Sequence, residues 1–354
     1  MGISAKGPIC YQFKALTDLW TGSVNLVEQK GQIKEKIVSD RLITTGLLGS
    51  IRWWFEVLIR GLGGSACDSS DDKSRCPDKY GQRCVVCEFF GCTSWARKFR
   101  FEVLNKDGEI IIDQIRKDDE LQLRFTPLRP IHIEEWTLLD TTLRLIVGYG
   151  AIGGKTVFKP TDEVERQNET HHQDFGLIEV FNADPPITDM EVNKLRNYVC
   201  DDRWRKPADV DFAWASLKHF WFVDGKALSR EKVDESTFNK VLGRKESKAC
   251  RDCGQVHNPP QKCPKTKKHP KRHSEHLVDP NDEISKWLAG SQRESKKVFS
   301  FKNPPRTFGF VKPGLIDFDV MKKRLQDVWG KGGWEFQTGE KIIDQLFDKK
   351  EGQS

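Results

Sequence analysis

The glycine-rich segment 148–156 (GYGAIGGKT) contains residues that could bind a phosphate group. Glycine permits positive φ angles and lets another group approach the backbone closely. Successive exposed N–H groups in such a segment form a concavity that binds anions. A lysine and a threonine follow the last glycine. The residues that we expect to contact phosphate are Gly150, Gly153, Gly154, Lys155 and Thr156.

The spacing of these glycines differs from two common phosphate-binding motifs. The P-loop pattern GxxxxGK[ST] is absent, because Tyr149 occupies the position of its first glycine. The segment also lacks the surrounding βαβ unit and downstream acidic residue of a dinucleotide-binding fold. A glycine-rich turn without any ligand remains an alternative interpretation.

Two groups of cysteine residues have the composition of zinc sites. The first group ends in a CxxC turn, and four thiolates satisfy the tetrahedral coordination of zinc. The residues between its members offer no hydrophobic core that would hold them otherwise. The alternative is that Cys84 and Cys87 are small buried residues and the other two lie in a mobile loop. The predicted ligands are Cys67, Cys76, Cys84 and Cys87.

The second group lies in a basic segment. Its spacing is close to that of a zinc knuckle, with Cys250, Cys253, His257 and Cys263 as predicted ligands. His269 or His273 could replace His257 in a set of three thiolates and one imidazole. Between residues 244 and 276 there are ten Lys or Arg and three acidic residues. This excess of positive charge indicates contact with nucleic acid or an acidic neighbour; a disordered basic insert is the alternative.

Composition restricts the class of protein. The length of 354 residues indicates two domains. The net charge of +6, the 31% of charged residues and the mean hydropathy of −0.60 indicate a protein without a membrane span. The N-terminus lacks the hydrophobic region of a signal peptide, and the most apolar helix, 44–62, carries charged residues. We therefore expect a cytoplasmic protein, in which ten cysteines favour metal binding over disulfides.

The elements that must position these residues follow from hydrophobic periodicity. In the first half, the pattern predicts a strand, a helix, three strands, a helix and a closing strand. This order is typical of a ferredoxin-like or RRM-like α+β domain, which we assign to residues 1–183. The predicted ranges are 9–20, 44–62, 98–104, 110–113, 121–127, 137–147 and 174–181.

The second half is predicted to form another domain of the same class, 184–354, interrupted by a Cys/His-rich basic insertion at about 244–277. Thr188 and Glu191 form a capping box that opens a helix. Strands are expected at 219–223 and 297–303. Two further helices are expected, one after Asp317 and one around 342–347.

Three segments of the sequence resemble a known family. They are SIRWWFEVLIRGLGG at 50–64, CVVCEFFGCTSWARKFRFEV at 84–103 and VGYGAIGGKTVFK at 147–159. In type and order these motifs are similar to those of the RAMP superfamily of CRISPR-associated proteins. Within it they resemble the family of first subunits of the type III-B Cmr effector complexes. The similarity is good over residues 10–182 and weaker beyond them, and the insertion at 244–277 departs from the family pattern.

The resemblance implies two ferredoxin-like domains and a subunit that binds guide RNA and target RNA near the 3′ end of the guide. It implies neighbouring RAMP subunits as partners, a role in antiviral defence and no catalytic activity. Further RNA-binding candidates follow from the basic and exposed positions of these motifs. They are Arg41, Arg52, Trp53, Arg97 and Lys98.

Two other function classes remain. A metal-independent endoribonuclease of the same superfamily would need a histidine base near the glycine-rich segment. His171 and His172 are the nearest candidates, and His132 and His219 lie on or beside expected strands. A zinc-finger DNA-binding protein would leave the RAMP-like motifs unexplained. RNA binding without cleavage is the interpretation that we favour.

Overall fold

The computed structural model describes residues 7–29, 32–38, 41–68, 71–153, 173–187, 190–207, 211–229, 236–247, 262–265, 275–278, 281–290 and 295–347. The chain divides into two compact units. The first comprises Met1–Val157, Asp174–Phe222 and Gln337–Ser354, and the second comprises Phe158–Gln173 and Val223–Phe336. Each unit is therefore built from separate stretches of sequence.

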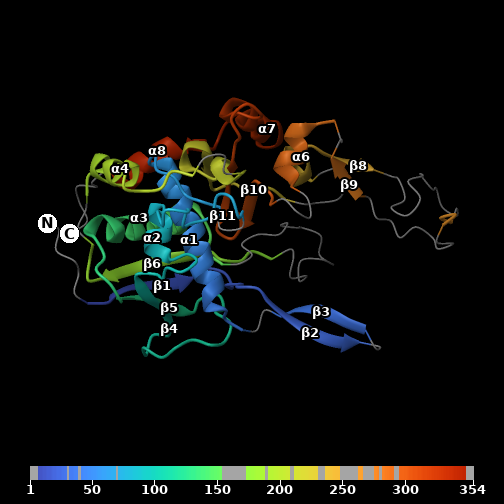
Figure 1. Ribbon diagram of the computed structural model, residues 1–354. Helices are drawn as coiled ribbons and strands as arrows, with labels where there is room; N and C mark the ends of the chain where they lie inside the picture. The colour runs from blue at the N-terminus through green and yellow to red at the C-terminus, as the bar shows by residue number, and fades with distance from the viewer. Residues whose placement is uncertain are drawn as a thin grey trace. The chain divides into compact units, whose positions relative to one another are not determined.

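The first unit contains a four-stranded antiparallel sheet (Figure 1). Its strands are β1 (Ile9–Ala15), β4 (Phe99–Leu104), β5 (Glu120–Pro127) and β6 (Ile178–Asp184). Their order across the sheet is β4-β5-β1-β6. The two strands in the middle, β5 and β1, are thus far apart in sequence and pair directly.

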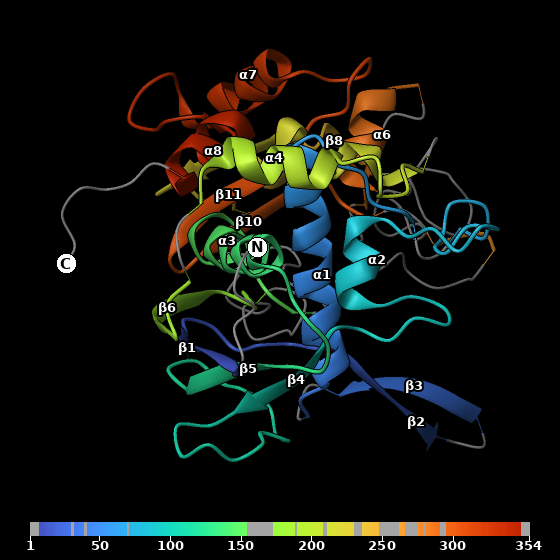
Figure 2. The ribbon, with the colours of Figure 1, turned by 60° about the vertical axis from the view of Figure 1, so that its left-hand side comes forward.

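Helices cover one face of this sheet (Figures 1 and 2). They are α1 (Thr44–Gly61), α2 (Val85–Phe90) and α3 (Ile133–Tyr149). The strands alternate accordingly: Tyr11, Phe13 and Phe125 are buried, whereas Gln12 is exposed. Because the aromatic side chains of these two central strands are buried, they offer no aromatic platform for base stacking on the opposite face.

Several sequence predictions for this unit are confirmed and others are corrected. The mixed α+β class, helix α1 and strands β1, β4, β5 and β6 are found, although β1 ends at Ala15 rather than residue 20. Helix α3 begins at Ile133, four residues earlier than predicted, because His132 and Glu135 form a capping box there. Segment 110–113 makes only isolated bridges and is not a strand.

A hairpin and a short helix between β1 and β4 were not predicted. One is the hairpin of β2 (Ser23–Gln29) and β3 (Gln32–Val38), which forms a separate two-stranded ribbon. The other is α2, whose six residues are too few to show helical periodicity.

The first unit is completed by residues that come much later in the chain. They form α4 (Val192–Cys200), two 3-10 helices (η3, Asp211–Trp214, and η4, Leu217–His219), the start of β7 (Phe220–Asp224), β12 (Gln337–Thr338) and α8 (Gly339–Phe347). Helix α8 packs against α3 and η4. Arg144 of α3 donates a hydrogen bond to the Leu346 carbonyl at 3.2 Å. Both the strand near 219–223 and the last helix were predicted.

Helix α4 follows the segment in which a capping box was predicted. The helix begins directly after Glu191, which occupies the N-cap position. Thr188, the other member of the predicted box, lies outside the described residues. The predicted helix is therefore confirmed. The predicted capping box is wrong, because Glu191 precedes the first turn instead of lying within it.

The second unit holds the remaining elements. They are α5 (Thr237–Val241), β8 (Arg244–Ser247), β9 (Glu275–Val278), α6 (Glu283–Ala289), β10 (Val298–Lys302), β11 (Pro305–Phe310) and α7 (Phe318–Trp329). Strands β10 and β11 form an antiparallel hairpin. The second four-stranded sheet of the chain has the order β10-β11-β7-β12, and β10 and β11 are the strands of it that lie wholly in this unit. Helix α7 begins directly after Asp317, as predicted, and Asp317 caps it: the carboxylate accepts from the Val320 amide at 2.8 Å.

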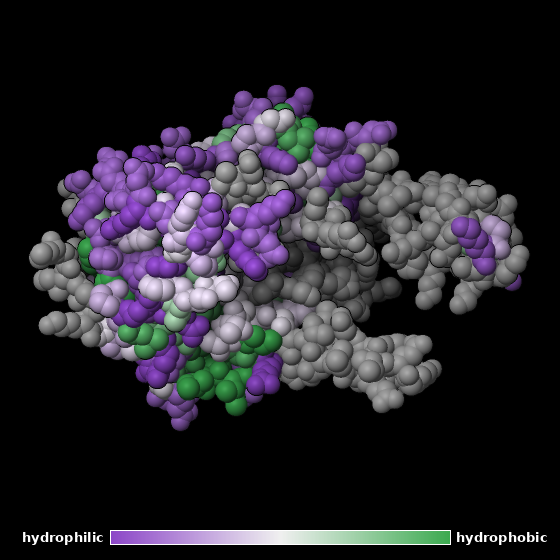
Figure 3. All heavy atoms as spheres, viewed as in Figure 1, coloured by the Kyte–Doolittle hydropathy of each residue, from purple (hydrophilic) through white to green (hydrophobic). Residues whose placement is uncertain are grey.

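The described surface is largely polar. Figure 3 shows hydrophilic residues over most of it on one face, with a hydrophobic area near β4. Ile110 and Ile112, in the connection from β4 to β5, are 63% and 68% exposed. None of the helices in the described ranges has the length and hydropathy needed to cross a membrane.

Candidate metal centre and glycine loop

The four cysteines of the first group converge in one buried site, which we call the tetracysteine cluster. The Sγ atoms of Cys67, Cys76, Cys84 and Cys87 all lie within 4.8 Å of one another. A tetrahedral zinc ion with Zn–S bonds of about 2.3 Å requires S–S separations of roughly 3.8 Å. The donor set and its size therefore fit a single zinc ion, which thiolates select. The alternative of two cysteines in a mobile loop is wrong.

Local structure brings the four thiols together. Cys84 and Cys87 lie at the start of α2, one helical turn apart. The loop before α2 brings the side chains of Cys67 and Cys76 next to those of Cys84 and Cys87. The Cys84 amide donates to Cys76 Sγ at 3.3 Å. All four residues are at most 3% exposed. Because the cluster is shielded from solvent, the thiolates depend on protein donors and on metal for compensation of their charge.

Contacts among the four thiols affect their acidity. Hydrogen bonds with Cys67 hold the pKa of Cys76 well below its usual range and raise that of Cys87 well above it. Zinc would displace the thiol protons on binding.

Arg52, a predicted RNA contact, lies beside this cluster. Its Nη2 is 3.2 Å from Cys87 Sγ, its Nη1 is 2.8 Å from the Gly91 carbonyl, and its Nε is 3.1 Å from a Glu56 carboxylate oxygen. These contacts occupy the guanidinium within the protein. These contacts do not support a role of Arg52 in RNA binding, and the RNA site proposed below does not include Arg52.

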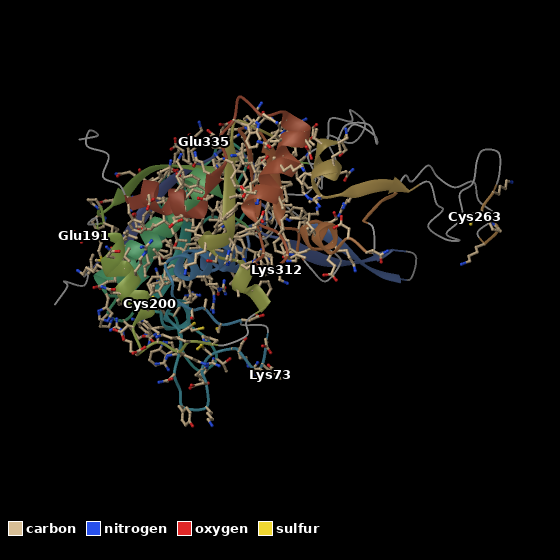
Figure 4. The ribbon with its side chains drawn as sticks, turned by 90° about the horizontal axis from the view of Figure 1, so that it is seen from above. Lys73, Glu191, Cys200, Cys263, Lys312 and Glu335 are labelled. Atoms are coloured by element: carbon tan, nitrogen blue, oxygen red, sulfur yellow. The ribbon has the colours of Figure 1, made fainter. Side chains whose placement is uncertain are left out.

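Arg205, which the sequence did not single out, approaches the cluster from another segment. Its Nη1 is 3.5 Å from Cys76 Sγ and 2.9 Å from the Ser74 carbonyl. Its Nη2 is 3.5 Å from the carbonyl of Lys73, which Figure 4 labels on the cysteine-rich loop. No local motif surrounds residue 205, so only tertiary structure could reveal this contact.

The second cysteine group falls mostly outside the described residues. Cys250, Cys253 and His257 belong to undescribed segments, and so do His269 and His273. Cys263 is described and is 1% exposed (labelled in Figure 4). The second zinc site therefore stays a prediction.

The glycine loop, which we define as residues 148–156, is described as far as Gly153. Gly150 ends α3 beside Trp54 of α1, where an added Cβ would lie 2.5 Å from the indole ring. Trp54 Nε1 donates to the Ala151 carbonyl at 2.8 Å. Gly153 has a φ of +120°, which favours glycine. Gly150 thus allows the loop to pack tightly against α1, and Gly153 allows it to pass close to the Trp20 carbonyl.

The amides of the described part of this loop already have protein acceptors. The Gly150 amide donates to Ile146, the Ile152 amide to Gly176 at 2.7 Å, and the Gly153 amide to Ser50 Oγ at 3.1 Å. The phosphate-binding concavity that we predicted is therefore not formed by these three amides. Gly154, Lys155 and Thr156 lie outside the described residues, and their contact with phosphate stays a prediction.

The other predicted RNA contacts have different surroundings. Arg41 is exposed and begins the segment that leads into α1. Trp53 is half-buried, with its ring 4.9 Å from that of Trp54 in an edge-to-face arrangement. Arg97 is half-buried, and its Nε donates to the Phe99 carbonyl at 3.0 Å. Of the two arginines, Arg41 has the more exposed side chain and therefore the more accessible charge.

Lys98 is buried in an ion pair. Its Nζ is 2.8 Å from a carboxylate oxygen of Glu135 and 3.3 Å from one of Glu88. Glu135 is 0% exposed. The ammonium group thus pairs with the buried carboxylate of Glu135 on α3 and the half-buried one of Glu88 on α2, and its surroundings favour a structural role.

The histidines considered for catalysis do not form a described site. His132 caps α3. His219 ends η4, where burial lowers its pKa below the usual value. His171 and His172 lie outside the described residues.

Comparison with protein families gives one match. Residues 12–158 match the model of the RAMP superfamily. The match covers less than half of the chain and includes β1, α1, the tetracysteine cluster, α3 and the glycine loop. It confirms the predicted resemblance over this segment. No curated protein matches the chain.

Solved structures give weaker similarities. One is Cmr1 from Pyrococcus furiosus in its apo form: identity is 9%, coverage is 94% of this chain and 99% of that chain, and the TM-score is 0.39. Another comes from the type III-B Cmr-beta complex bound to cognate target RNA, with 10% identity, 91% and 99% coverage and a TM-score of 0.41. A chain of the Csm3–Csm4 subcomplex of a type III-A CRISPR-Cas interference complex has 12% identity, 51% and 79% coverage and a TM-score of 0.24. All three TM-scores are below 0.5, so no argument about this chain rests on them.

Proposed function

We propose that this chain, whose residues 12–158 match the RAMP superfamily, is a non-catalytic RNA-binding subunit of a type III-B CRISPR ribonucleoprotein effector complex. It would act in the cytoplasm in antiviral defence. In this proposal it contacts guide and target RNA near the 3′ end of the guide and binds other RAMP subunits. Base pairing between guide and target reads the sequence, and the protein holds the RNA backbone.

The observation that carries the proposal is the anchoring of the glycine loop within the RAMP segment. Trp54, Ser50 and Gly176 hold residues 151–153 through three hydrogen bonds of 2.7–3.1 Å. The sequence Gly154-Lys155-Thr156 therefore continues from a fixed point on the first unit. A lysine in that position would contact phosphate without sequence preference.

The fold supports assignment to the ferredoxin-like class. The first sheet is built from residues 9–184 and the second from residues 220–338. Within each sheet the second and third strands in sequence lie at one side and the first and fourth at the other, giving the orders β4-β5-β1-β6 and β10-β11-β7-β12. We therefore propose two ferredoxin-like domains, with the strands of the first before residue 185 and the strands of the second after it.

A charge reversal tests the RNA-binding proposal. Fluorescence anisotropy with a labelled single-stranded guide RNA should show weaker binding for Lys155→Glu across unrelated sequences. The slope of log K against log salt should fall by about 1, since one phosphate contact is lost. Lys106→Glu is the matched control, because Lys106 is exposed in the turn after β4. Equal affinities of both variants and the wild type, with unchanged circular dichroism, would contradict the role of Lys155.

The same RNA distinguishes binding from cleavage. Incubation without metal should leave it intact, both with the purified chain and with the other subunits present. Cleavage that is lost in His171→Ala or His172→Ala would instead establish the endoribonuclease class.

We also propose that zinc is a structural cofactor of the tetracysteine cluster. The cluster fits the ion in donor type and dimensions. A second zinc ion, with ligands Cys250, Cys253, His257 and Cys263, is proposed for the basic insertion. Elemental analysis of protein never exposed to chelator should give one to two equivalents. Less than about half an equivalent would contradict both sites.

A further inference from the structure

Two arginines from distant parts of the sequence contact sulfur atoms of the tetracysteine cluster. Arg52 lies on α1 and reaches Cys87 Sγ at 3.2 Å. Arg205 follows α4 and reaches Cys76 Sγ at 3.5 Å. Both contacts belong to the first unit. Two different thiols of the cluster thus each receive a guanidinium donor.

Both guanidinium groups are held in place by other acceptors. Arg52 is fixed by Glu56 at 3.1 Å and by the Gly91 carbonyl at 2.8 Å. Arg205 donates to the carbonyls of Ser74 and Arg75 at 2.9 and 2.5 Å. Three of these acceptors are backbone carbonyls in or next to the cysteine-rich segment, so each arginine binds both a sulfur atom and the backbone near it.

The backbone adds a further link on the Arg205 side. The Arg205 amide donates to the Arg83 carbonyl at 2.9 Å, directly before Cys84. Arg205 therefore spans the loop from residue 74 to residue 83. The Arg52 side is fixed by α1, whose residues Val57, Leu58 and Ile59 are fully buried. The position of Arg52 is thus set by a part of the fold that does not depend on the cluster itself.

The charge of a metal-loaded cluster would match these two cations. Zinc with four thiolates carries a formal charge of −2, and the cluster is buried. Two guanidinium groups supply two positive charges, of which that of Arg52 is also paired with the Glu56 carboxylate, and N–H donors to sulfur stabilise the thiolate form. Residues that contact the ligands of a metal in this way orient them and tune the metal's affinity.

We propose that Arg52 and Arg205 are positioning residues of the zinc centre, which retain the metal by neutralising and orienting its thiolates. This inference rests on the proposed zinc site. It makes retention of the metal depend on a residue that lies more than a hundred positions beyond the last cysteine of the cluster. It also assigns Arg52 of the Arg-Trp-Trp motif to the metal centre.

The rate of zinc release measures how far Arg52 and Arg205 retain the metal. Arg52→Met and Arg205→Met remove the charge and keep an unbranched side chain, and Arg100→Met is the matched control, since Arg100 is 58% exposed on β4. Transfer of zinc from the full chain to a chromogenic chelator should be about 10 to 100 times faster in the two variants than in the control. Arg52→Lys and Arg205→Lys should restore part of the retention, because the charge is kept.

Cobalt substitution separates a role at the metal from a role in folding alone. In the Co²⁺-loaded protein, loss of an N–H donor to sulfur raises the energy of the sulfur electrons. The thiolate-to-cobalt absorption band should then move to longer wavelength in both Met variants and stay unchanged in Arg100→Met. If a Met variant does not fold, the absorption band and the zinc release rate are measured in the corresponding Lys variant, and these two values then test the role of that arginine.

The outcomes are distinct. A wild-type protein without zinc contradicts the zinc site and leaves the arginine contacts as ordinary structural bonds. A wild-type protein with zinc, but with unchanged release rates and absorption bands in the folded variants, overturns the inference and leaves the zinc site intact.

Discussion

Among single residues, Lys98 gives the clearest prediction about stability. Its ammonium group pairs with Glu135, which is 0% exposed, at 2.8 Å. Lys98→Met leaves a buried carboxylate without its cation, so the free energy of unfolding should fall by about 3–5 kcal/mol. Urea denaturation measures the change. Arg100→Met, two residues further along the chain, is the control: its pair with Glu102 is exposed on the arginine side, and its loss should cost about 1 kcal/mol or less.

The double variant Lys98→Met/Glu135→Gln tests the explanation. Removal of both charges should recover much of the lost stability, because the double variant has neither the Lys98 ammonium nor the Glu135 carboxylate and so leaves neither of them unpaired. If the double variant is as unstable as the sum of the single ones, the two side chains act independently and the ion pair is not the cause.

At the level of elements, the packing of the glycine loop against α1 gives a second prediction. In Gly150→Ala the new methyl group would lie 2.5 Å from the Trp54 ring. Accommodating it should cost about 1–3 kcal/mol of unfolding free energy, and the emission of Trp54 should change. Gly148→Ala is the matched control. No atom lies within 4 Å of its Cβ position, and alanine in helix α3 should stabilise by about 0.5–1 kcal/mol.

Opposite signs in these two variants would establish that Gly150 is needed for close approach. Equal effects would mean that glycine acts at both positions only through backbone entropy.

Metal removal is the third prediction, and it concerns α2 and the loop before it. The six residues of α2 are too few to form a stable helix alone. Chelation of zinc should therefore lower the melting temperature and increase hydrogen exchange in residues 67–91, while the amides of β1 and β5 stay protected. Full protection of residues 67–91 after complete removal of zinc would show that protein contacts alone hold the cluster.

The elements also show what could be predicted from sequence. Helix α1, the strands of the first sheet and the four cysteine ligands depend on local periodicity and spacing, which the sequence displays directly. The contact between Arg205 and Cys76 depends on how the chain returns after α4, and no local pattern contains that information. The same holds for the glycine loop: its glycines suggest a ligand, but Gly150 and Gly153 are explained by Trp54 and by a positive φ angle. The ion pair of Lys98 could not be predicted for a similar reason, since a basic residue beside an alternating strand does not reveal the carboxylates that it meets.

For the whole molecule, the discontinuous first unit leads to a fourth prediction. Helix α8, near the C-terminal end, packs against α3 and η4 of this unit, and its Ile342 is 0% exposed. Ile342→Ala should lower the free energy of unfolding by about 2–5 kcal/mol. Hydrogen exchange should increase in α3 and η4 rather than in α5 and α7. Asp344→Ala, on the exposed side of α8, is the control. Increased exchange confined to the second unit would contradict the assignment of α8.

The discontinuity also has a consequence for biosynthesis. Translation delivers β1 through η4 first, and α8 only after residues 223–336 have left the ribosome. Domains generally fold as units in the order in which they emerge, but this unit lacks a helix until residues 339–347 have been synthesised. The surface of α3 and η4 that α8 covers thus stays open to chaperones throughout translation of the second unit. A chain released before α8 is made would keep that surface exposed and remain available for degradation.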